Sequence, residues 1–259
     1  MLSQFFTGLL LMVAVFAAGW IVCVRVRNYG FLDVFWSYGL VVLAPLYAWW
    51  GRGDPVRKWL FAGVALVWGL RLGTHILRRV WRHHPQEDAR YRSFRAKWPR
   101  PVLFLGFFEL QAVLIAVLSV PFLLACGNPE AGLKPIEIAG LALSLLAVGG
   151  EAMADAQLAR FKARAGRAGG ICEVGWWRYS RHPNYFFESL VWWGFFLAAC
   201  GSPWGWTTVF CPLLMLYFLF RVTGIPLTEE FALKSKGDAY RAYQRTTSAF
   251  VPLPRKKTS

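Results

Sequence analysis

Residues 4–24 read QFFTGLLLMVAVFAAGWIVCV, a run that contains no Lys, Arg, Asp or Glu. An α-helix needs about 20 mainly apolar residues to cross the hydrocarbon core of a bilayer, so this run predicts a transmembrane helix. The first twenty residues lack the basic region and the small-residue cleavage site of a signal peptide. We therefore expect this helix to be retained.

Further apolar runs of similar length follow along the chain. They predict an all-α, polytopic membrane protein of about seven transmembrane helices, in a single membrane domain over residues 1–259. The composition agrees, because 56% of the residues are hydrophobic and only 17% are charged. A soluble domain this apolar would expose large hydrophobic patches. The further runs are approximately 30–50, 59–77, 102–126, 136–158, 186–201 and 205–225.

The basic residues fall in alternate connections between these runs. Twenty-three of the 29 Lys and Arg residues lie in segments 25–29, 78–101, 159–185 and 226–259, and only four lie in the other connections. Because cytoplasmic loops carry the excess of Lys and Arg, the count predicts an outside N-terminus and a cytoplasmic C-terminus. Segment 78–101 mixes arginines with aromatic residues, so we expect an interfacial helix there.

The formal net charge is +15. Since the charges lie between long apolar runs, the expected partners are membrane lipids with anionic headgroups or a phosphorylated cofactor, and not nucleic acid. The five cysteines are scattered without metal-ligand spacing, and the chain has only four histidines. We expect buried, unpaired cysteines and no metal site.

The segment with the most polar residues is 151–188, EAMADAQLARFKARAGRAGGICEVGWWRYSRHPNYFFE. Cations separated by Gly-rich backbone suit a ligand that carries phosphates. Charge alone leaves an equally good alternative, a basic loop that only orients the protein in the membrane. Asn184 and Glu188 are four residues apart, so they share one face of a helix.

The pattern of this segment resembles the signature of the integral-membrane reductase superfamily that includes steroid 5-alpha-reductases and sterol reductases. The likeness is closest to the bacterial DUF1295 proteins, and isoprenylcysteine carboxyl methyltransferases are distant cousins. The matching elements are GWWRYSRHPNYFFE at 175–188, ADAQLARFK at 154–162, GIPLTEE at 224–230, GDAYRAYQRTTSAFVPLP at 237–254 and LDVFWSYG at 32–39.

This resemblance implies an enzyme of the 3-oxo-5-alpha-steroid 4-dehydrogenase type, which binds NADPH in a cytoplasm-facing cavity. Such an enzyme passes a hydride to an activated C=C bond of a lipophilic, steroid- or isoprenoid-like substrate. In the acidic element GIPLTEE this chain has Ile225 and Pro226 where the sterol reductases have a basic residue ahead of the acid. The resemblance assigns cofactor binding to the residues that match the family's motifs. These are Asp155, Lys162, Trp177, Arg178, Arg181, His182, Asn184, Tyr185, Glu188, Arg221, Glu230, Tyr240 and Tyr243.

Hydride transfer to an enone also requires particular side chains in the active site. Negative charge develops on the ketone oxygen, so a neutral donor must point at that oxygen and a proton must reach the second carbon. A carboxyl group buried among apolar helices can stay protonated and act as the donor. The candidate catalytic residues are Asp33, Tyr91, Glu109 and Glu188, with His75 and Tyr38 as further alternatives.

Two residues of the signature have a competing structural interpretation. Asp33 can instead form a hydrogen bond between helices. His182 precedes Pro183, which restricts His182 to an extended conformation and can start the next helix. We therefore favour a structural role for His182.

Two other functions remain open from the sequence. One is a membrane methyltransferase that uses S-adenosylmethionine, because that family shares an Arg-His-Pro element and an acidic pair before the tail. The other is a lipid-binding membrane protein without catalytic activity. Methyltransferases of this kind usually lack the combination of Asn184 and Glu188, which favours the reductase. The DUF1295 likeness suggests the inner membrane of a bacterium.

Overall fold

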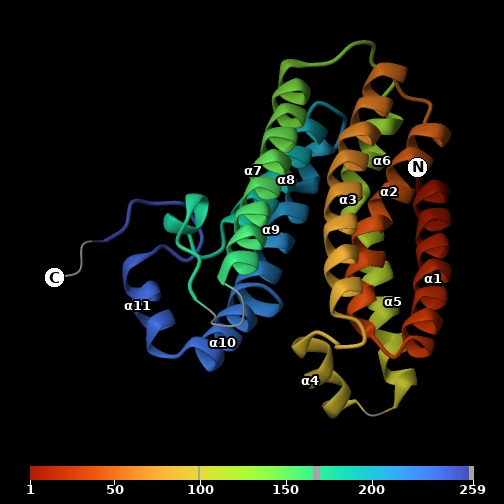
Figure 1. Ribbon diagram of the computed structural model, residues 1–259. Coiled ribbons are helices and arrows are strands. Elements are labelled where there is room, and N and C mark those ends of the chain that lie inside the picture. The colour runs from red at the N-terminus through yellow and green to blue at the C-terminus, as the bar shows by residue number, and fades with distance from the viewer. Residues whose placement is uncertain (99, 166–169, 257–259) are drawn as a thin grey trace. The chain divides into compact units, whose positions relative to one another are not determined.

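The computed structural model describes residues 1–98, 100–165 and 170–256 (Figure 1). These residues form helices, and the only β-structure among them is an isolated bridge between Ser180 and Ser248. In chain order the elements are α1 Leu2–Arg25, η1 Tyr29–Phe31, α2 Leu32–Trp50, α3 Pro55–His83, α4 Ala89–Lys97, α5 Pro101–Leu118, α6 Val120–Gly127, α7 Pro135–Ala165, η3 Gly175–Arg178, α8 Pro183–Ala199, η4 Gly205–Val209, α9 Phe210–Tyr217, the π-helix η5 Phe218–Val222, α10 Ile225–Lys236 and α11 Asp238–Thr246.

Six helical stretches of the described chain are long and apolar enough to cross a membrane, which confirms the all-α, polytopic membrane fold. The remaining predicted run, 186–201, corresponds to α8. This helix has 17 residues, the lower end of the about 17–25 residues that span a bilayer. The six stretches are Leu2–Arg25, Tyr29–Trp50, Pro55–His83, Pro101–Gly127, Pro135–Arg164 and Gly205–Lys236.

Two of the predicted runs form more than one helical element, and prolines lie at the start of the helix that follows each break. The run 102–126 is interrupted at Ser119, and Pro121 lies in the first turn of α6. The run 205–225 contains η4, α9 and η5, and α10 then begins after Gly224 with Pro226 in its first turn. Proline has no amide hydrogen to donate, so it is tolerated at the start of a helix and interrupts a longer one.

The prediction of one interfacial helix over 78–101 is wrong in its bounds. Helix α3 continues to His83, and the separate helix α4 covers only Ala89–Lys97. Asp88 starts α4, because its side chain accepts a hydrogen bond from the amide of Arg90 at 2.9 Å. Tyr91 is 4% exposed, so its side chain packs inside unit 1.

The described chain divides into two compact units. Unit 1 comprises Met1–Leu141 and Leu197–Thr208, and unit 2 comprises Ala142–Phe196 and Val209–Ser259. Within unit 1, α2 packs along α3 and α1 packs along α5. Small residues permit this close approach. A Cβ atom on Gly69 would lie 2.6 Å from the Val41 side chain, and one on Gly39 would lie 2.7 Å from Ile115.

A fully buried ion pair in unit 1 joins the start of α3 to the start of α7. Arg57 Nε lies 2.6 Å from Glu137 Oε1, and both side chains are 0% exposed. The guanidinium also donates to the backbone carbonyls of Asn128, Glu130 and Gly132. Arg57 therefore fixes the loop that joins α6 to α7, although the sequence analysis placed it only among the few basic residues outside the cytoplasmic segments.

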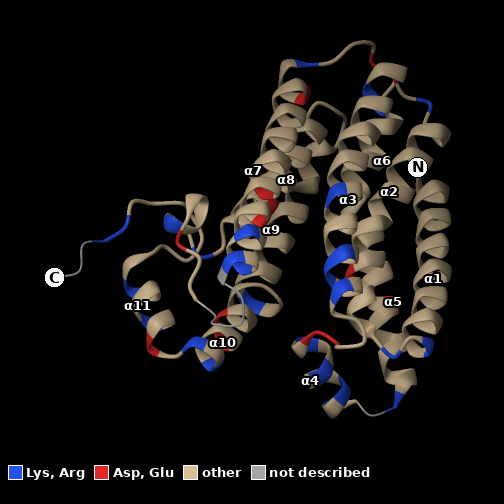
Figure 2. Cartoon of the chain, in the orientation of Figure 1, with Lys and Arg blue, Asp and Glu red and all other residues tan. Residues whose placement is uncertain are grey.

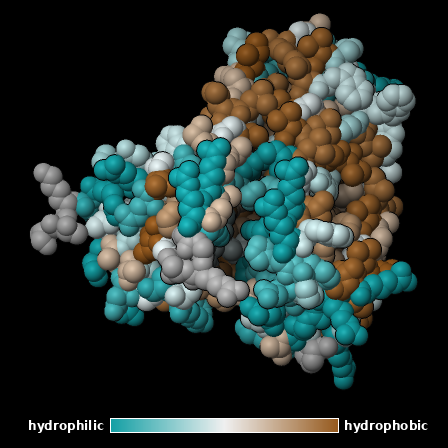
Figure 3. Space-filling view, in the orientation of Figure 1, coloured by the Kyte–Doolittle hydropathy of each residue, from teal (hydrophilic) through white to brown (hydrophobic). Residues whose placement is uncertain are grey.

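The outer faces of the helices are apolar. Leu2, Phe6 and Leu10 of α1 are 76%, 56% and 68% exposed, and hydrophobic side chains cover the helices above α4 in the space-filling view (Figure 3). Lys and Arg residues gather on α4 and on the neighbouring end of α3 (Figure 2). This distribution is that of a multi-pass membrane protein whose apolar faces contact lipid.

Four of the five cysteines are buried, as the sequence predicted. All five are free thiols, and Cys200 is partly exposed. The prediction of buried cysteines is therefore confirmed for four of them and wrong for Cys200.

Candidate functional site

The signature turn at residues 175–178 is held by the preceding helix. Gln157 of α7 accepts a hydrogen bond from the amide of Trp176 at 2.9 Å, and Trp177 Nε1 donates to the carbonyl of Ala154 at 2.8 Å. Gly175 has φ +58, and a Cβ atom there would lie 2.2 Å from Gln157. Glycine is therefore required by both the backbone conformation and the close approach of α7.

The C-terminal tail joins the same turn. The amide of Arg181 donates to the carbonyl of Ser248 at 2.8 Å, and Ser180 Oγ donates to Phe250 O at 2.7 Å. Tyr243 of α11 donates to the carbonyl of Trp177. The loop before α8 and the tail after α10 thus lie at the same end of unit 2.

Glu229 is the centre of a hydrogen-bonded cluster in unit 2. Its carboxylate accepts from Arg181 Nε at 2.6 Å and from Gln244 Nε2 at 2.8 Å. Tyr240 donates to it at 3.4 Å, and His182 Nε2 lies 3.3 Å away. Glu229 of the GIPLTEE element is therefore the common acceptor of this cluster.

Glu230, which the sequence analysis assigned to the cofactor site, lies elsewhere. Its side chain is 54% exposed and pairs with Lys234 at 2.5 Å, one helical turn along α10. Adjacent residues of an α-helix point about 100° apart, so only one of the two glutamates can face the cluster.

His182 is buried against the start of α8. It is 2% exposed, and its ring stacks on that of Tyr185 with centroids 5.3 Å apart and planes at 3°. Helix α8 begins at Pro183, as predicted. The Tyr185 hydroxyl lies 3.1 Å from Thr228 Oγ1, so this hydrogen bond connects α8 to α10.

The two phenols of α11 are also buried. Tyr240 is 5% exposed and Tyr243 is 3% exposed. Burial raises the pKa of both phenols above the ordinary value of tyrosine. Both therefore stay neutral donors at physiological pH.

A second polar group in unit 2 lies between α7 and α8. Asn184 Nδ2 donates to Asp155 Oδ1 at 3.3 Å, and Trp192 Nε1 donates to Glu188 Oε1 at 3.0 Å. The two helices are antiparallel, because Ser144, earlier on α7, bonds to Val191, later on α8. The structure therefore brings Asp155, Asn184 and Glu188 onto one interface.

Glu151 belongs to the same interface and was not among the predicted site residues. It is 3% exposed and lies one turn before Asp155, as Glu188 lies one turn after Asn184. In antiparallel helices these offsets place Glu151 level with Glu188. Its spacing of four residues from Asp155 was the signal available in the sequence.

Besides Glu230, three further predicted cofactor residues lie on the surface of unit 2. Lys162, Arg178 and Arg221 are exposed. Arg221 was expected to face the interior of the helix bundle, but it lies in the π-helix η5 at the end of its span, where a long side chain reaches water or headgroups.

Unit 1 holds a separate polar cluster around Asp33. Tyr91 donates to Asp33 Oδ1 at 2.6 Å, and Arg90 Nη2 donates to Asp33 Oδ2 at 2.8 Å. Burial and the negative charge of Asp33 hold the pKa of Tyr91 well above its usual value. The neutral donor of this cluster is thus Tyr91.

The structure adds a neighbouring network that the sequence did not reveal. Glu87 accepts from the amide of Tyr29 at 2.6 Å and from Arg95 at 2.8 Å. Arg95 also lies over the Tyr29 ring, 4.4 Å from its centroid. Together with the Asp33 cluster, these contacts dock α4 on unit 1.

Glu109 is not part of either network. It lies on α5, is partly exposed, and its buried Oε2 atom has no hydrogen-bond partner among the described residues. Carboxyl groups inside membrane-spanning segments cost free energy and are often functional. Its catalytic role stays a prediction.

A family model described as "Protein of unknown function (DUF1295)" matches residues 19–247. The chain belongs to the DUF1295 family. This match runs through both units and includes every candidate site residue from Asp33 to Tyr243.

The other comparisons name no activity. An uncharacterized protein of Schizosaccharomyces pombe is 27% identical over 280 residues, covering 96% of this chain and 80% of the relative. No solved structure matches the chain. The resemblance to DUF1295 proteins in the sequence is thus confirmed, and the activity is a separate question.

Proposed function

We propose that this DUF1295 protein is an NADPH-dependent membrane reductase. It transfers a hydride to an activated C=C bond, such as that of an enone, in a lipophilic steroid- or isoprenoid-like substrate. The active site faces the cytoplasm, because the basic segments 159–185 and 226–259 carry the cofactor residues.

One observation carries the proposal. Three parts of the reductase signature that are far apart in sequence meet in unit 2: the ADAQLARFK element, the turn before α8, and α11 with the tail. Trp177 is bonded to both of the other parts, through Ala154 on one side and Tyr243 on the other. A structural role alone does not require the polar residues Asp155, Asn184 and Glu188 on the adjacent interface. These side chains offer both donors and acceptors, which the carboxamide of a nicotinamide ring can match.

The test is a comparison of cofactors on the purified protein in detergent or nanodiscs. We expect saturable binding of NADPH and none of S-adenosylmethionine at the same concentration, measured by calorimetry. Binding of S-adenosylmethionine without NADPH would assign the protein to the methyltransferases. Absence of binding by either compound would favour a lipid-binding protein without catalytic activity.

Reduction also needs a proton donor, and Tyr91 is our candidate. Burial and the charge of Asp33 raise the pKa of this phenol, so it stays neutral, and its hydrogen bond to Asp33 holds it in place. It can turn this hydrogen bond toward a ketone oxygen that becomes negative. Asp33 orients the phenol, and Arg90 compensates the charge of Asp33.

Replacing Tyr91 by Phe should lower the turnover of a steroid enone about 100-fold or more, because general acid catalysis of this kind contributes roughly 10²–10⁴-fold. NADPH binding should be unchanged. The measurement is NADPH oxidation with the enone present. Tyr217→Phe is the matched control, since Tyr217 is 57% exposed and belongs to neither polar cluster. Equal turnover in the two variants would remove Tyr91 from the mechanism.

A further inference from the structure

The helix ends around α4 form one basic surface of unit 1. The end of α1 meets α4 and the start of α5 here, since Arg95 donates to the carbonyl of Arg27 at 3.5 Å and Trp20 donates to the carbonyl of Pro101 at 3.0 Å. Lys and Arg residues also gather on the neighbouring end of α3 (Figure 2). We call this region the α4 surface. It comprises residues 25–27, 78–98 and 100–101, which contain ten Lys and Arg residues.

The acidic residues at the α4 surface are bound by two arginines of α4. Arg90 pairs with Asp33 at 2.8 Å and with Asp88 at 3.1 Å. Arg95 pairs with Glu87 at 2.8 Å. Both arginines are partly buried, because their ion pairs dock α4 on unit 1. These three acids therefore do not compensate the other basic residues of the surface.

Most of the positive charge at the α4 surface has no partner. Arg79 adds only a long contact of 3.9 Å to Asp33. The remaining seven basic residues are all exposed, and none forms an ion pair with any residue in the part of the chain that the structure describes. They are Arg25, Arg27, Arg78, Arg82, Arg92, Lys97 and Arg100.

Exposed apolar side chains lie within one helical turn of these cations. Val22 precedes Arg25 on α1, and Val102 follows Arg100 at the start of α5. Trp81 of α3 is 71% exposed, and tryptophan is common at the boundary between membrane and water. In the space-filling view, hydrophilic side chains near α4 adjoin the hydrophobic surface of the helices (Figure 3). The cations thus lie where the apolar faces end, at the level of lipid headgroups.

We infer that the α4 surface binds the headgroups of anionic phospholipids in the leaflet that it faces. A cluster of about four to eight Lys and Arg residues at the end of a transmembrane helix attracts such headgroups. Guanidinium groups also donate paired hydrogen bonds to phosphate oxygens. The exposed apolar side chains match the acyl chains, which a soluble anion lacks. None of the seven cations belongs to the predicted cofactor or catalytic residues, so headgroup binding does not depend on the reductase activity.

The test is a titration of the purified protein in neutral detergent with dioctanoyl phosphatidylglycerol, followed by native mass spectrometry. We expect saturable binding about tenfold or more tighter than that of dioctanoyl phosphatidylcholine. Arg92→Gln combined with Lys97→Gln should weaken it roughly 25-fold, because each cation near an anionic headgroup contributes about fivefold. Arg78→Gln combined with Arg82→Gln on α3 should have a similar effect. All four side chains are exposed and unpaired, so both variants should keep the circular dichroism of the wild type.

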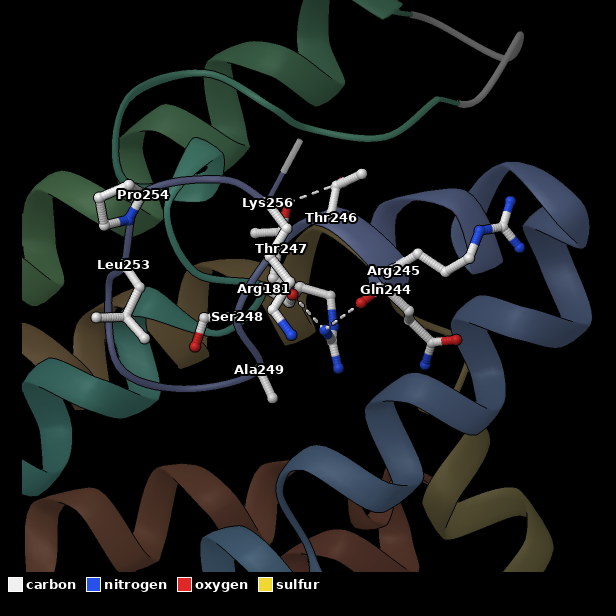
Figure 4. Close-up of a pocket in the computed structure, with 10 residues that line it drawn as sticks. All are labelled: Arg181, Gln244, Arg245, Thr246, Thr247, Ser248, Ala249, Leu253, Pro254 and Lys256. Atoms are coloured by element: carbon white, nitrogen blue, oxygen red, sulfur yellow. Dashed lines mark hydrogen bonds between the residues drawn. The ribbon is translucent and has the colours of Figure 1, made fainter. Parts of the chain in front are cut away.

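Basic residues of unit 2 provide the matched control, because the fold itself engages several of them. In a pocket of about 330 Å³ lined by the C-terminal tail, Arg181 donates to two backbone carbonyls (Figure 4). Lys234 and Arg241 are each 67% exposed, and each pairs with an acid one turn away on its own helix. Lys234→Gln combined with Arg241→Gln should therefore leave the affinity for phosphatidylglycerol unchanged.

Three results would overturn the headgroup site. An equal loss of affinity in the control variant would show that phosphatidylglycerol responds only to the net charge of the protein. Binding of glycerol 3-phosphate as tightly as the lipid would identify the partner as a soluble phosphate compound. Binding of polyglutamate that depends on Arg92 and Lys97, without binding of phosphatidylglycerol, would point to an acidic protein.

Discussion

Replacing Arg57 by Ala should lower the free energy of unfolding by about 3–5 kcal/mol, because it leaves Glu137 as an uncompensated buried charge. Both side chains are 0% exposed, and Arg57 also satisfies three backbone carbonyls of the loop between α6 and α7. Denaturant titration of the purified protein in detergent measures the effect.

Two controls define the cause of that loss. Arg52→Ala removes an exposed arginine from the connection between α2 and α3, five residues before Arg57, and it should change stability by less than about 0.5 kcal/mol. The double change Arg57→Met with Glu137→Leu removes both charges, so it should recover most of the stability. If Arg57→Ala unfolds at the same denaturant concentration as Arg52→Ala, the ion pair does not stabilise the loop.

Replacing Glu188 by Ala should abolish reduction of an enone while the protein remains folded. We place Glu188 and Asn184 at the nicotinamide end of the cofactor, where loss of a preorganised polar contact costs about 100-fold or more in turnover. The assay is NADPH oxidation, and circular dichroism checks the fold. Close to wild-type turnover with normal NADPH binding would show that Glu188 is structural.

The structure sharpens this experiment, because Glu188 has a partner on its own helix. Trp192 donates to Glu188 at 3.0 Å, so Glu188→Ala also leaves the indole N–H without its acceptor. Trp192→Phe removes the donor and keeps the carboxylate. If Glu188 acts on the cofactor, Trp192→Phe should retain activity. If the role of Glu188 is to hold Trp192, both variants should fail equally, and Glu188→Gln should stay active because its amide oxygen still accepts the bond.

The candidate site could be predicted only in part. The sequence indicated Asp155, Asn184 and Glu188, and the structure brings them to one interface. It also indicated Asp33 and Tyr91 separately, on a helix and on a segment expected at the membrane surface. Their bond at 2.6 Å joins residues 58 positions apart, and Arg90, which pairs with the same carboxylate, was not foreseen.

The two glutamates of the GIPLTEE element show why such contacts cannot be predicted from the sequence. Glu229 and Glu230 are neighbours, and no local property distinguishes them. The orientation of α10 decides which one faces Arg181, 48 residues away. A rotation of about 100° per residue then directs Glu229 into the cluster and Glu230 to the surface.

By itself, the sequence determined that this chain is a multi-pass helical membrane protein. Long apolar runs must form hydrogen-bonded helices in lipid, and that requirement is local to each run. Only the tertiary structure decided which charges are paired, as for Arg57 with Glu137, Arg181 with Glu229 and Arg90 with Asp33. Each pair joins segments that are distant in sequence. Its partners are therefore selected by helix packing, and the apolar pattern that sets the helices contains no information about them.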